Sequence, residues 1–597
     1  MSQDERSRTS PPPTFKMTDT TERLFSTASI VRMLVKMRMR MATKRHSKHF
    51  YRSISDNPRL SQKQDAPRQA TASGGDVARL KVTDCVPGRR YWPHPRREIR
   101  LSSDCEKAQE NALVAKMLRD MGDSGYVSVW KDNLLALCCH VKNRIEGDEI
   151  SFERPRLHLL SKKGKGAFRC LATYENLADR IILGRLAMHL RSVFDSQMRD
   201  NSYAFRKNGA IKHITAIRRL KDFRLKYHGK KLYVAECDIQ KFFDVIHHDV
   251  ALDAFDAFAA ANGSDIEPWM RQAVCAYLKS YYSFRNLAED ADVPEEQKDM
   301  VGFYSSGKLR NALRKIYGKV HLEELPIGIP QGGALSPLLI NLVLHRADEA
   351  VLSGGDDEEL FYARYCDDMV IVHPNSKKCK AAFNRYLMMM ESLRLPVHPV
   401  MRGMRYGKEF FDGKSKGPYA WTDCRYGALR SSPWVSFLGE QVRFDGEVRI
   451  RQESIEKHQL KLWKEKGLLQ RAIGKSGAFL KRTLEATDVF DRFCSRLVAV
   501  GVGYSSWERM GDSKDRCWIA AFPGISDSPR TRLQMKRLDR SRDSVLCAVR
   551  NGCLNSKDIG GPKRFLGKPF SYRGFLEREE RSNRHDFMDG VSAYGEW

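Results

Sequence analysis

The sequence lacks the cysteine spacing of a zinc domain and the long apolar runs of a membrane protein. Its 14 cysteines include no Cys-x-x-Cys pair, and the adjacent Cys138 and Cys139 are poorly placed to bind one tetrahedral metal. We therefore expect reduced thiols and no structural zinc. No uninterrupted apolar run approaches the roughly 20 residues of a transmembrane helix. The first residues include Asp4 and Glu5 and no apolar core followed by a cleavage site, so we expect no secretory signal, no membrane partner and a cytoplasmic location.

Acidic residues are also in deficit. The chain has 103 Lys and Arg residues against 74 Asp and Glu residues, a formal net charge of +29. Such a surplus favours a polyanionic partner, nucleic acid above all, over a merely solubilising surface. With 597 residues, of which 42% are hydrophobic, the chain is long enough for several globular domains that need no disulfides.

Two adjacent acids lie between apolar arms in residues 361–372, which read FYARYCDDMVIV. The arms are typical of two strands, and Asp367 and Asp368 of the turn between them. Carboxylates this close repel each other unless a cation lies beside them, which indicates bound Mg²⁺. The alternative is an ordinary solvated Asp-Asp turn.

Two further blocks favour the metal site over that alternative. Residues 232–244, LYVAECDIQKFFD, read as a strand that presents Asp238 at its end and is followed by two aromatic rings. Residues 326–341, PIGIPQGGALSPLLIN, form a turn rich in Gly and Pro that leads into an apolar helix. Because glycine has no side chain, Gly332 and Gly333 would let a nucleotide or a nucleic-acid backbone approach closely.

In this order the three blocks resemble the palm of a reverse transcriptase, of the bacterial lineage that includes group II intron and retron enzymes. Shorter matches occur at residues 168–172 with 179–180, 202–206 with 216–217, and 437–439. The resemblance implies an α+β fold of right-hand polymerase architecture. Fingers and a palm with an antiparallel sheet would be followed by an α-helical thumb or C-terminal domain. It also implies RNA-directed DNA polymerase activity.

The resemblance assigns the catalytic and metal-binding roles. Asp238, Asp367 and Asp368, together with the backbone carbonyl of Ile239, would hold two Mg²⁺ ions, for which Mn²⁺ can substitute. The three carboxylates would be the catalytic residues. After residue 397 the chain departs from its relatives, because His398-Pro399 and a long insertion replace a Glu-Lys-Thr-like element. The proton donor to the leaving pyrophosphate is therefore left unassigned.

The same resemblance assigns the nucleotide and the nucleic-acid contacts. Arg169 would contact the phosphates of the incoming nucleotide, and Gln331 would lie near its base. Phe243 would lie beneath its sugar, where the ring would exclude a 2′-hydroxyl; the alternative is that Phe243 is an ordinary core residue. The expected nucleic-acid contacts are Arg206, Gly332, Gly333, Lys536 and Arg537.

The remaining segments suggest the domain order. We expect a basic, largely disordered arm over residues 1–75, a helical extension over 76–150, fingers and palm over 151–450, a helical thumb over 451–550 and a basic tail over 551–597. Within the arm, residues 22–48 interleave apolar and basic side chains. This pattern is typical of a helix that orders on RNA or against the protein body, or that stays a solvated arm.

The biological role is suggested by features that are missing. The chain has neither the Val-Thr-Gly of retron thumbs, nor the cysteine pairs of a His/Cys endonuclease, nor the Ser-Gln variant of diversity-generating elements. What remains resembles the unknown-group and abortive-infection reverse transcriptases. This implies cDNA synthesis from deoxynucleoside triphosphates on a dedicated non-coding RNA, in antiphage defence. One alternative is a group II intron-type maturase that binds intron RNA and assists splicing. Another, RNA-dependent RNA synthesis, is disfavoured by Phe243. The primer and the oligomeric state carry no readable signature.

Overall fold

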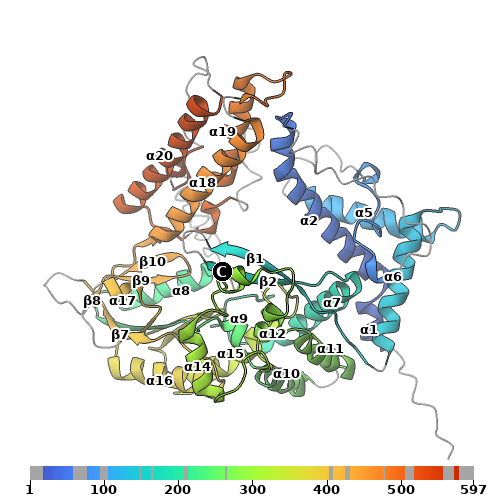
Figure 1. The fold of residues 1–597 in the computed structure, drawn as a ribbon. Helices are drawn as coiled ribbons and strands as arrows, with labels where there is room; N and C mark the ends of the chain where they lie inside the picture. Colours follow the sequence, from blue (N-terminus) through green and yellow to red (C-terminus); the bar gives the residue numbers. More distant parts are fainter. Residues whose placement is uncertain are drawn as a thin grey trace, which may run out of the picture.

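The chain combines a β-sheet body with long helices on either side of it (Figure 1). The computed structural model describes residues 18–57, 77–93, 105–147, 149–162, 167–207, 213–262, 265–355, 357–401, 408–423, 431–474, 477–503, 517–522, 524–554 and 570–576. Helices and separate, mainly antiparallel sheets confirm the α+β class expected from the sequence. No helix within these ranges is long and apolar enough to cross a membrane.

The palm is organised around a six-stranded sheet in which β4, β5, β3, β7 and β6 are neighbours in that order and β8 pairs with β7. The strands are β3 (Leu232–Cys237), β4 (Phe361–Tyr365), β5 (Asp368–His373), β6 (Val400–Met401), β7 (Ser415–Trp421) and β8 (Ser431–Ser432). Strand β3 pairs antiparallel with β5 and β7, and β4 pairs antiparallel with β5. The expected antiparallel sheet is confirmed for these four strands, whereas the short strands β6 and β8 run parallel to β7.

Both faces of the palm sheet are buried, which explains why its strands read as nearly continuous apolar runs. On one face, Met369 and Ile371 of β5 belong to the main core, together with helices α15 (Ser336–Leu352) and α16 (Ser376–Ser392). On the other face, Val370 and Val372 pack in a second core with helix α8 (His213–Lys226). The hairpin that carries the acid pair is therefore held from both sides.

The fingers consist of an antiparallel hairpin and the helices that support it. The hairpin is β1 (Arg156–Lys162) and β2 (Ala167–Thr173), followed by helix α7 (Leu177–Phe194). Between β3 and α15 the helices are α9 (Phe242–Val245), α10 (His248–Asn262), α11 (Pro268–Lys279), α12 (Ser283–Ala288), α13 (Glu295–Lys298) and α14 (Gly307–Tyr317). After α13 the chain returns to the fingers hairpin, where the Phe168 N–H of β2 donates a hydrogen bond to the Met300 carbonyl at 2.8 Å.

The thumb has a core of its own and rests on a small sheet. That sheet is antiparallel, with strands β9 (Trp434–Phe437), β10 (Glu440–Arg443) and β11 (Val448–Ile450). Helices α18 (Gln452–Ile473), α19 (Ala486–Val502) and α20 (Pro529–Gly552) follow it. Their buried side chains form a cluster separate from the two cores of the palm. This helical unit, which ends at Gly552, extends two residues beyond the range expected for the thumb, residues 451–550.

Glu440 lies on β10, at the base of the thumb, and gives the fold a pH dependence. Its side chain is 1% exposed, and its Oε1 has no hydrogen-bond partner among the described residues. Burial raises the pKa of Glu440 to about 8, whereas in an unfolded chain a Glu loses its proton near pH ~4.3. The folded state therefore binds one proton more than the unfolded state between these values, and stability falls as the pH rises from about 4 to 8.

We expect Glu440→Gln to remove that fall, because glutamine has the shape of the protonated acid and no charge to desolvate. At pH 8 and above the variant should gain on the order of 3–5 kcal/mol. Thermal unfolding of both proteins in a pH series would measure the difference. Parallel profiles for the two proteins would show that Glu440 does not titrate as its burial implies.

Residues 18–57 are folded, which corrects the expectation of a largely disordered arm for this part of the chain. They form helices α1 (Asp19–Leu24) and α2 (Thr27–Ser53), whose first N–H groups are capped by Thr18 and Ser26. Apolar side chains at helical spacing bury one side of α2 against helix α5 (Cys105–Gly122), beside α6 (Val129–Glu146). The basic helix foreseen in this arm thus orders against the protein body. The other parts of the arm, residues 1–17 and 58–75, lie largely outside the described residues.

Residues 570–576 likewise belong to the thumb core, which corrects the expected basic tail at this point. Phe570 and Tyr572 are buried, and the Arg542 guanidinium donates to the Phe570 carbonyl at 2.7 Å. The Tyr572 N–H donates to Asp539 at 2.9 Å. Bulky rings with satisfied backbone groups dock this segment on α20.

Candidate active site

Three carboxylates gather at one edge of the palm sheet because the strands that carry them end there. Cys237, the last residue of β3, pairs with Met369 of β5, so Asp238 follows β3 beside the start of β5. Tyr365 pairs with Asp368, which leaves Cys366 and Asp367 as the two-residue turn of the β4–β5 hairpin. The acid pair predicted at a hairpin tip and the acid predicted at a strand end are thus adjacent.

The hairpin turn is strained and is supported by a buried arginine. Cys366 has a φ of +59°, a left-handed conformation that non-glycine residues seldom adopt. The Arg364 guanidinium donates to the Cys366 carbonyl at 3.1 Å and forms a bidentate pair with Asp348 at 2.6 and 2.7 Å. Arg364 and Asp348 are both buried. This pair fixes the backbone that presents Asp367.

Uncompensated negative charge marks the site electrostatically. Asp368 is exposed at the edge of the sheet, yet desolvation by the protein around it, the Asp367 carboxylate and the Asp238 carboxylate raise its pKa to about 7. Burial and the Asp238 carboxylate also raise the pKa of Asp367 above its usual range. Three hard oxygen ligands with too little positive charge around them suit a divalent cation such as Mg²⁺. The donor set therefore fits the predicted ions, whereas the role of the Ile239 carbonyl stays a prediction.

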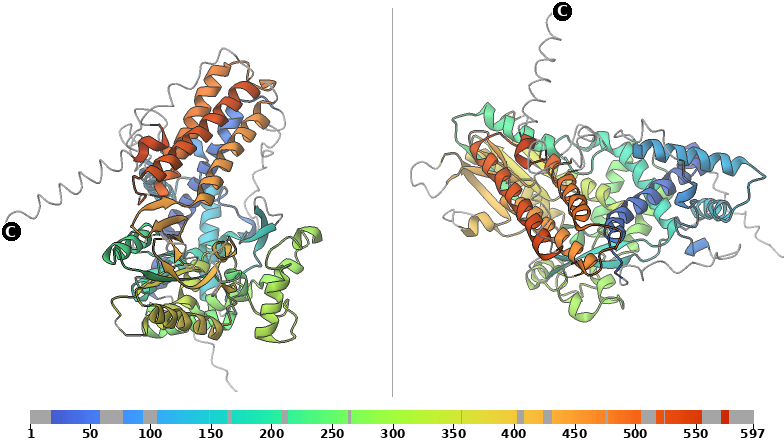
Figure 2. Two further views of the ribbon diagram at one scale, coloured as in Figure 1. Left: turned by 90° about the vertical axis from the view of Figure 1, so that its left-hand side faces the viewer. Right: turned by 90° about the horizontal axis from the view of Figure 1, so that it is seen from above.

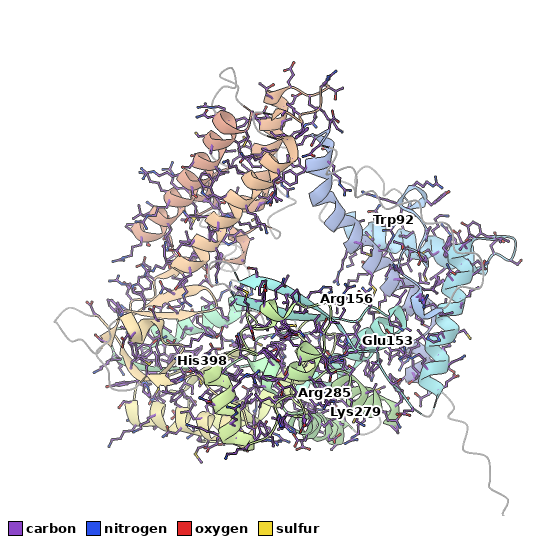
Figure 3. The ribbon with its side chains drawn as sticks, viewed as in Figure 1. Trp92, Glu153, Arg156, Lys279, Arg285 and His398 are labelled. Carbon is purple, nitrogen blue, oxygen red and sulfur yellow. The ribbon has the colours of Figure 1, made fainter. Side chains whose placement is uncertain are left out.

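Two basic side chains that sequence reasoning did not place in the site lie next to Asp238. Lys414, just before β7, forms an ion pair with Oδ2 of Asp238, and Nε2 of His398 is 3.7 Å from the same oxygen. His398 lies in the palm, well away from Arg156 of the fingers (Figure 3). The long insertion after His398 hid Lys414, because β7 resumes the palm only at Ser415. No local pattern marks Lys414, because β7 reads SKGPYAW and its Gly and Pro are uncommon in strands.

A cavity of about 710 Å³ connects the acids to the thumb. Asp238, Asp368 and Lys414 line it on the palm side. Leu438 and Gly439, of the third short match, and residues 451–453 at the start of α18 also line it. A space with this lining can hold a polar chain end directly against the Asp238 and Asp368 carboxylates.

The two residues assigned to the nucleotide's phosphates and base are brought together. The Arg169 Nε donates to Oε1 of Gln331 at 2.6 Å, and Nε2 of Gln331 donates to Asp244 at 3.3 Å. Arg169 is exposed, so its remaining N–H groups can reach a phosphate. Phe243 lies on α9 between Asp244 and the acid edge and is only half-buried, which leaves part of its ring accessible.

Two residues predicted to contact nucleic acid have other roles. The Arg206 side chain is 3% exposed, and it donates to Asp195 and to the carbonyls of Arg199 and Ser202. Its prediction as a nucleic-acid contact is wrong, because its donors are used inside the protein. Gly333 is buried, and a Cβ added there would lie 1.8 Å from the Tyr277 hydroxyl. This glycine is needed for packing rather than for the approach of a ligand.

The other predicted nucleic-acid residues are accessible. Gly332 is exposed with a φ of +106°, so its backbone conformation favours glycine independently of any ligand. Lys536 and Arg537 are exposed on α20 of the thumb, outside the lining of the active-site cavity. Their contacts with nucleic acid stay predictions.

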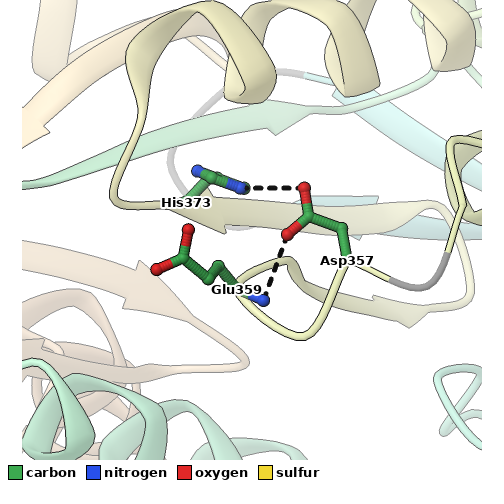
Figure 4. Close-up of side chains that lie close together, drawn as sticks. All are labelled: Asp357, Glu359 and His373. Carbon is green, nitrogen blue, oxygen red and sulfur yellow. Dashed lines mark hydrogen bonds and ion pairs between the residues drawn. The ribbon is translucent and has the colours of Figure 1, made fainter.

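A second acidic cluster, formed by Asp357, Glu359 and His373, is not a good metal site. Its ligand atoms lie within 4.8 Å of one another (Figure 4). Nδ1 of His373 accepts the Asn375 N–H at 2.7 Å, so the neutral ring carries its proton on Nε2, which donates to Asp357 at 3.1 Å. Lys378 also lies 3.1 Å from that carboxylate. The Asp357 and His373 atoms that a cation would need as ligands are therefore already engaged in these contacts.

Comparison with known proteins agrees with this geometry. Residues 160–400 match the family model described as reverse transcriptase (RNA-dependent DNA polymerase). A curated relative from Saccharomyces cerevisiae, the "Putative COX1/OXI3 intron 1 protein", is 26% identical over 208 residues, which are 35% of this chain and 19% of that protein. The chain thus spans about a fifth of the length of the curated relative it matches. The expected resemblance to reverse transcriptases of an intron-like lineage is confirmed; the bacterial and defence-associated assignments stay predictions.

Distant likenesses also occur among solved structures. Apo telomerase from Candida tropicalis, truncated from its C-terminal domain, aligns with 13% identity and a TM-score of 0.30, over 58% of this chain and 67% of that chain. Telomerase from Candida albicans in complex with a fragment of telomeric RNA aligns with 12% identity and a TM-score of 0.32, over 74% of this chain and 72% of that chain.

Proposed function

We propose that this chain, whose residues 160–400 form a reverse transcriptase domain, is an RNA-directed DNA polymerase that extends a primer along an RNA template. The observation that carries the proposal is the placement of Asp238, Asp367 and Asp368 at adjacent strand ends, with raised pKa values at the latter two. The experiment that tests it supplies a primed RNA, a divalent metal and labelled deoxynucleotides or ribonucleotides to the purified protein. Deoxynucleotide incorporation is expected, and no incorporation on any primed RNA would refute the proposal.

The residues of this chain hold the reactants in place for nucleotidyl transfer. Two divalent ions bound by the three carboxylates would lower the pKa of the primer 3′-hydroxyl and stabilise the leaving pyrophosphate. Arg169 donates to the triphosphate, and Gln331 orients Arg169 through the hydrogen bond between them. Lys414 offsets the charge of Asp238 and thereby keeps that carboxylate aimed into the cavity. Catalysis then rests on positioning and on charge stabilisation.

Phe243 is proposed to select the sugar. In Phe243→Ala the ring that would collide with a 2′-hydroxyl is gone, so the preference for deoxynucleotides over ribonucleotides should fall by on the order of 10²-fold. The ratio of the two kcat/KM values on one primed RNA measures this preference. Tyr126→Ala, which removes an exposed ring from the N-terminal extension, is the matched control and should leave the ratio unchanged. An unchanged ratio in Phe243→Ala would make Phe243 a core residue only.

For the biological role, we propose cDNA synthesis on a dedicated non-coding RNA in antiphage defence, in the cytoplasm. The support is that the palm and thumb sequences lack the retron tripeptide and the diversity-generating variant. The cysteines that the structure describes are all unpaired, which suits a reducing compartment. A second candidate, an intron maturase, is favoured by the similarity to a yeast intron protein.

Sequencing of the RNA that co-purifies with the protein separates these roles. One small RNA copied into cDNA, with phage plating reduced by the wild type and not by Asp367→Ala, supports defence. Bound intron RNA, with splicing that survives Asp367→Ala, would replace defence by the maturase role.

A further inference from the structure

The C-terminal end of α2 is inserted into the thumb through a set of contacts that we call the latch, residues 51–57. Tyr51 and Ile54 are buried in the thumb core. Neither residue belongs to the palm cores. Instead they join α2 to α18 and α19 of the thumb. The Tyr51 hydroxyl donates to Glu465 of α18, and the Arg496 guanidinium of α19 lies 5.2 Å from the Tyr51 ring centroid.

Hydrogen bonds to the thumb backbone complete the latch. The Ser55 hydroxyl donates to the Ala472 carbonyl at 2.6 Å, and the Asn57 amide donates to the Arg471 carbonyl at 3.0 Å. Ser55 also pairs with Leu480 in an antiparallel β-bridge. Next to this bridge, the Asp56 N–H donates a hydrogen bond to the Phe479 carbonyl at 2.9 Å. Directed bonds to the last turn of α18 and to the segment that follows it fix α2 there in a single register.

The N-terminal end of α2 is anchored in the fingers. Arg185 of α7 donates to the Leu24 carbonyl at 2.9 Å and to the Ser29 hydroxyl at 2.8 Å. Thr18 and Thr21 donate to the Glu267 carboxylate, which precedes α11. The long helix is therefore held at both ends, by the fingers at one and by the thumb at the other (Figures 1 and 2).

These anchors close a circuit of elements around the active site. The palm continues into the thumb where β11 leads to α18, the latch joins the thumb to α2, and α2 returns to α7 of the fingers. The active-site cavity is bordered by Asp238 on the palm and by Glu453 at the base of α18, which are consecutive members of this circuit. Palm, thumb, α2 and fingers are thus joined by contacts in that order.

Both long helices of the circuit carry exposed cations. On α2, Arg32, Lys36 and Arg40 form an exposed row at four-residue spacing. On α18, Lys457 and Lys464 are exposed on the side away from the thumb core, with Leu460 52% and Trp463 42% exposed beside them. Rows of cations suit the two phosphate backbones of a duplex.

We infer that α2 and its latch make the polymerase a closed ring that encircles the template–product duplex. This inference rests on the proposed polymerase function, and it adds a mode of holding nucleic acid that needs no sequence-specific contact. A closed ring loads by threading a free end or by opening the latch, and it releases a template without ends only when the latch opens.

A reversible cross-link tests the ring directly. Ser55→Cys with Leu480→Cys places two thiols on opposite residues of the bridge, where Cα atoms lie about 4.5–5.5 Å apart, within disulfide range. The full-length variant is oxidised either before or after it meets a primed RNA, which is supplied as a closed circle or as the same sequence linearised. Each single-cysteine variant, treated identically, controls for the native thiols.

The order of the two steps decides the outcome. Locked before loading, the variant should bind the linear template normally and fail to load on the circle. Locked after loading, it should leave the circle on the order of 10²-fold more slowly than the linear form in high salt, because detached enzyme stays tethered. Reduction should abolish both effects. Equal loading on the circle by the locked enzyme would overturn the ring.

A milder variant tests the same inference in case the disulfide fails to form. Tyr51→Phe with Ser55→Ala and Asn57→Ala removes latch hydrogen bonds and leaves the apolar packing in place. We expect addition of a single nucleotide at the wild-type rate, with shorter products when a heparin trap prevents rebinding. Unchanged product lengths in the variant would contradict the ring inference. If the wild-type protein added no nucleotide at all, the polymerase function would be refuted instead.

Discussion

Replacing Asp367 by Ala should abolish nucleotide incorporation while leaving RNA binding largely intact. The Asp367 carboxylate lies at the hairpin turn, next to Asp368 and close to Asp238, and it is proposed to ligate both catalytic ions. Without it the ions are held weakly, and the primer hydroxyl and the pyrophosphate lose their charge stabilisation. We expect kcat to fall by about 10³-fold or more.

Primer extension with single-turnover kinetics measures this loss, and filter binding measures the RNA affinity. Asp357→Asn is the matched control, because it changes an acid of the second cluster at the far end of β5. The control should retain activity. An active Asp367→Ala protein would refute the metal assignment, and equal losses in both variants would point to the stability of the sheet rather than to catalysis.

Arg364→Met should cause the largest loss of stability among single substitutions in the palm. The Arg364 side chain is 1% exposed and that of its partner Asp348 is 0% exposed. Methionine fills much of the volume and removes the charge, which leaves the Asp348 carboxylate buried without its cation. Breaking a buried pair in this way costs about 3–5 kcal/mol. Activity should fall as well, since Arg364 also holds the Cys366 carbonyl.

Chemical denaturation of the variant, with a double-mutant cycle, checks this expectation. Adding Asp348→Asn to Arg364→Met removes the stranded charge and should recover part of the loss. Arg271→Met breaks the exposed pair with Asp256, whose side chains are 53% and 39% exposed, and should cost at most about 1 kcal/mol. If Arg364→Met were no more destabilising than this control, the buried pair would not be what supports the catalytic turn.

The palm was predictable from the sequence because its information is local. Strands can be recognised from short apolar runs and the turn residues that bound them. One such run ends in Asp238, and a second is interrupted by Asp367 and Asp368. The assignment of Arg169 and Gln331 to one site came from the order of the family's blocks, and the hydrogen bond between them is what the structure adds.

What the sequence did not predict depends on contacts between distant segments. Lys414 reaches Asp238 only because β7 lies beside β3, and the insertion conceals that pairing. Arg206 and Gly333 match motifs of the family, yet the surroundings of each decide its role: Asp195 engages the first and Tyr277 occupies the space beside the second. The pattern of residues 22–48 indicated a helix, but its partners in the fingers and the thumb are distant in the chain and no local pattern reveals them.

The latch also orders the events of biosynthesis. Tyr51 and its partner Glu465 are 414 residues apart in the chain, so a ribosome that adds about 5–20 residues per second needs roughly 20–80 s to make the second after the first. Throughout that interval the fingers and the palm are emerging, while the end of α2 has nothing to dock on. On the ring inference, RNA present at the site of translation can therefore enter the nascent chain from the side, before the thumb has been synthesised.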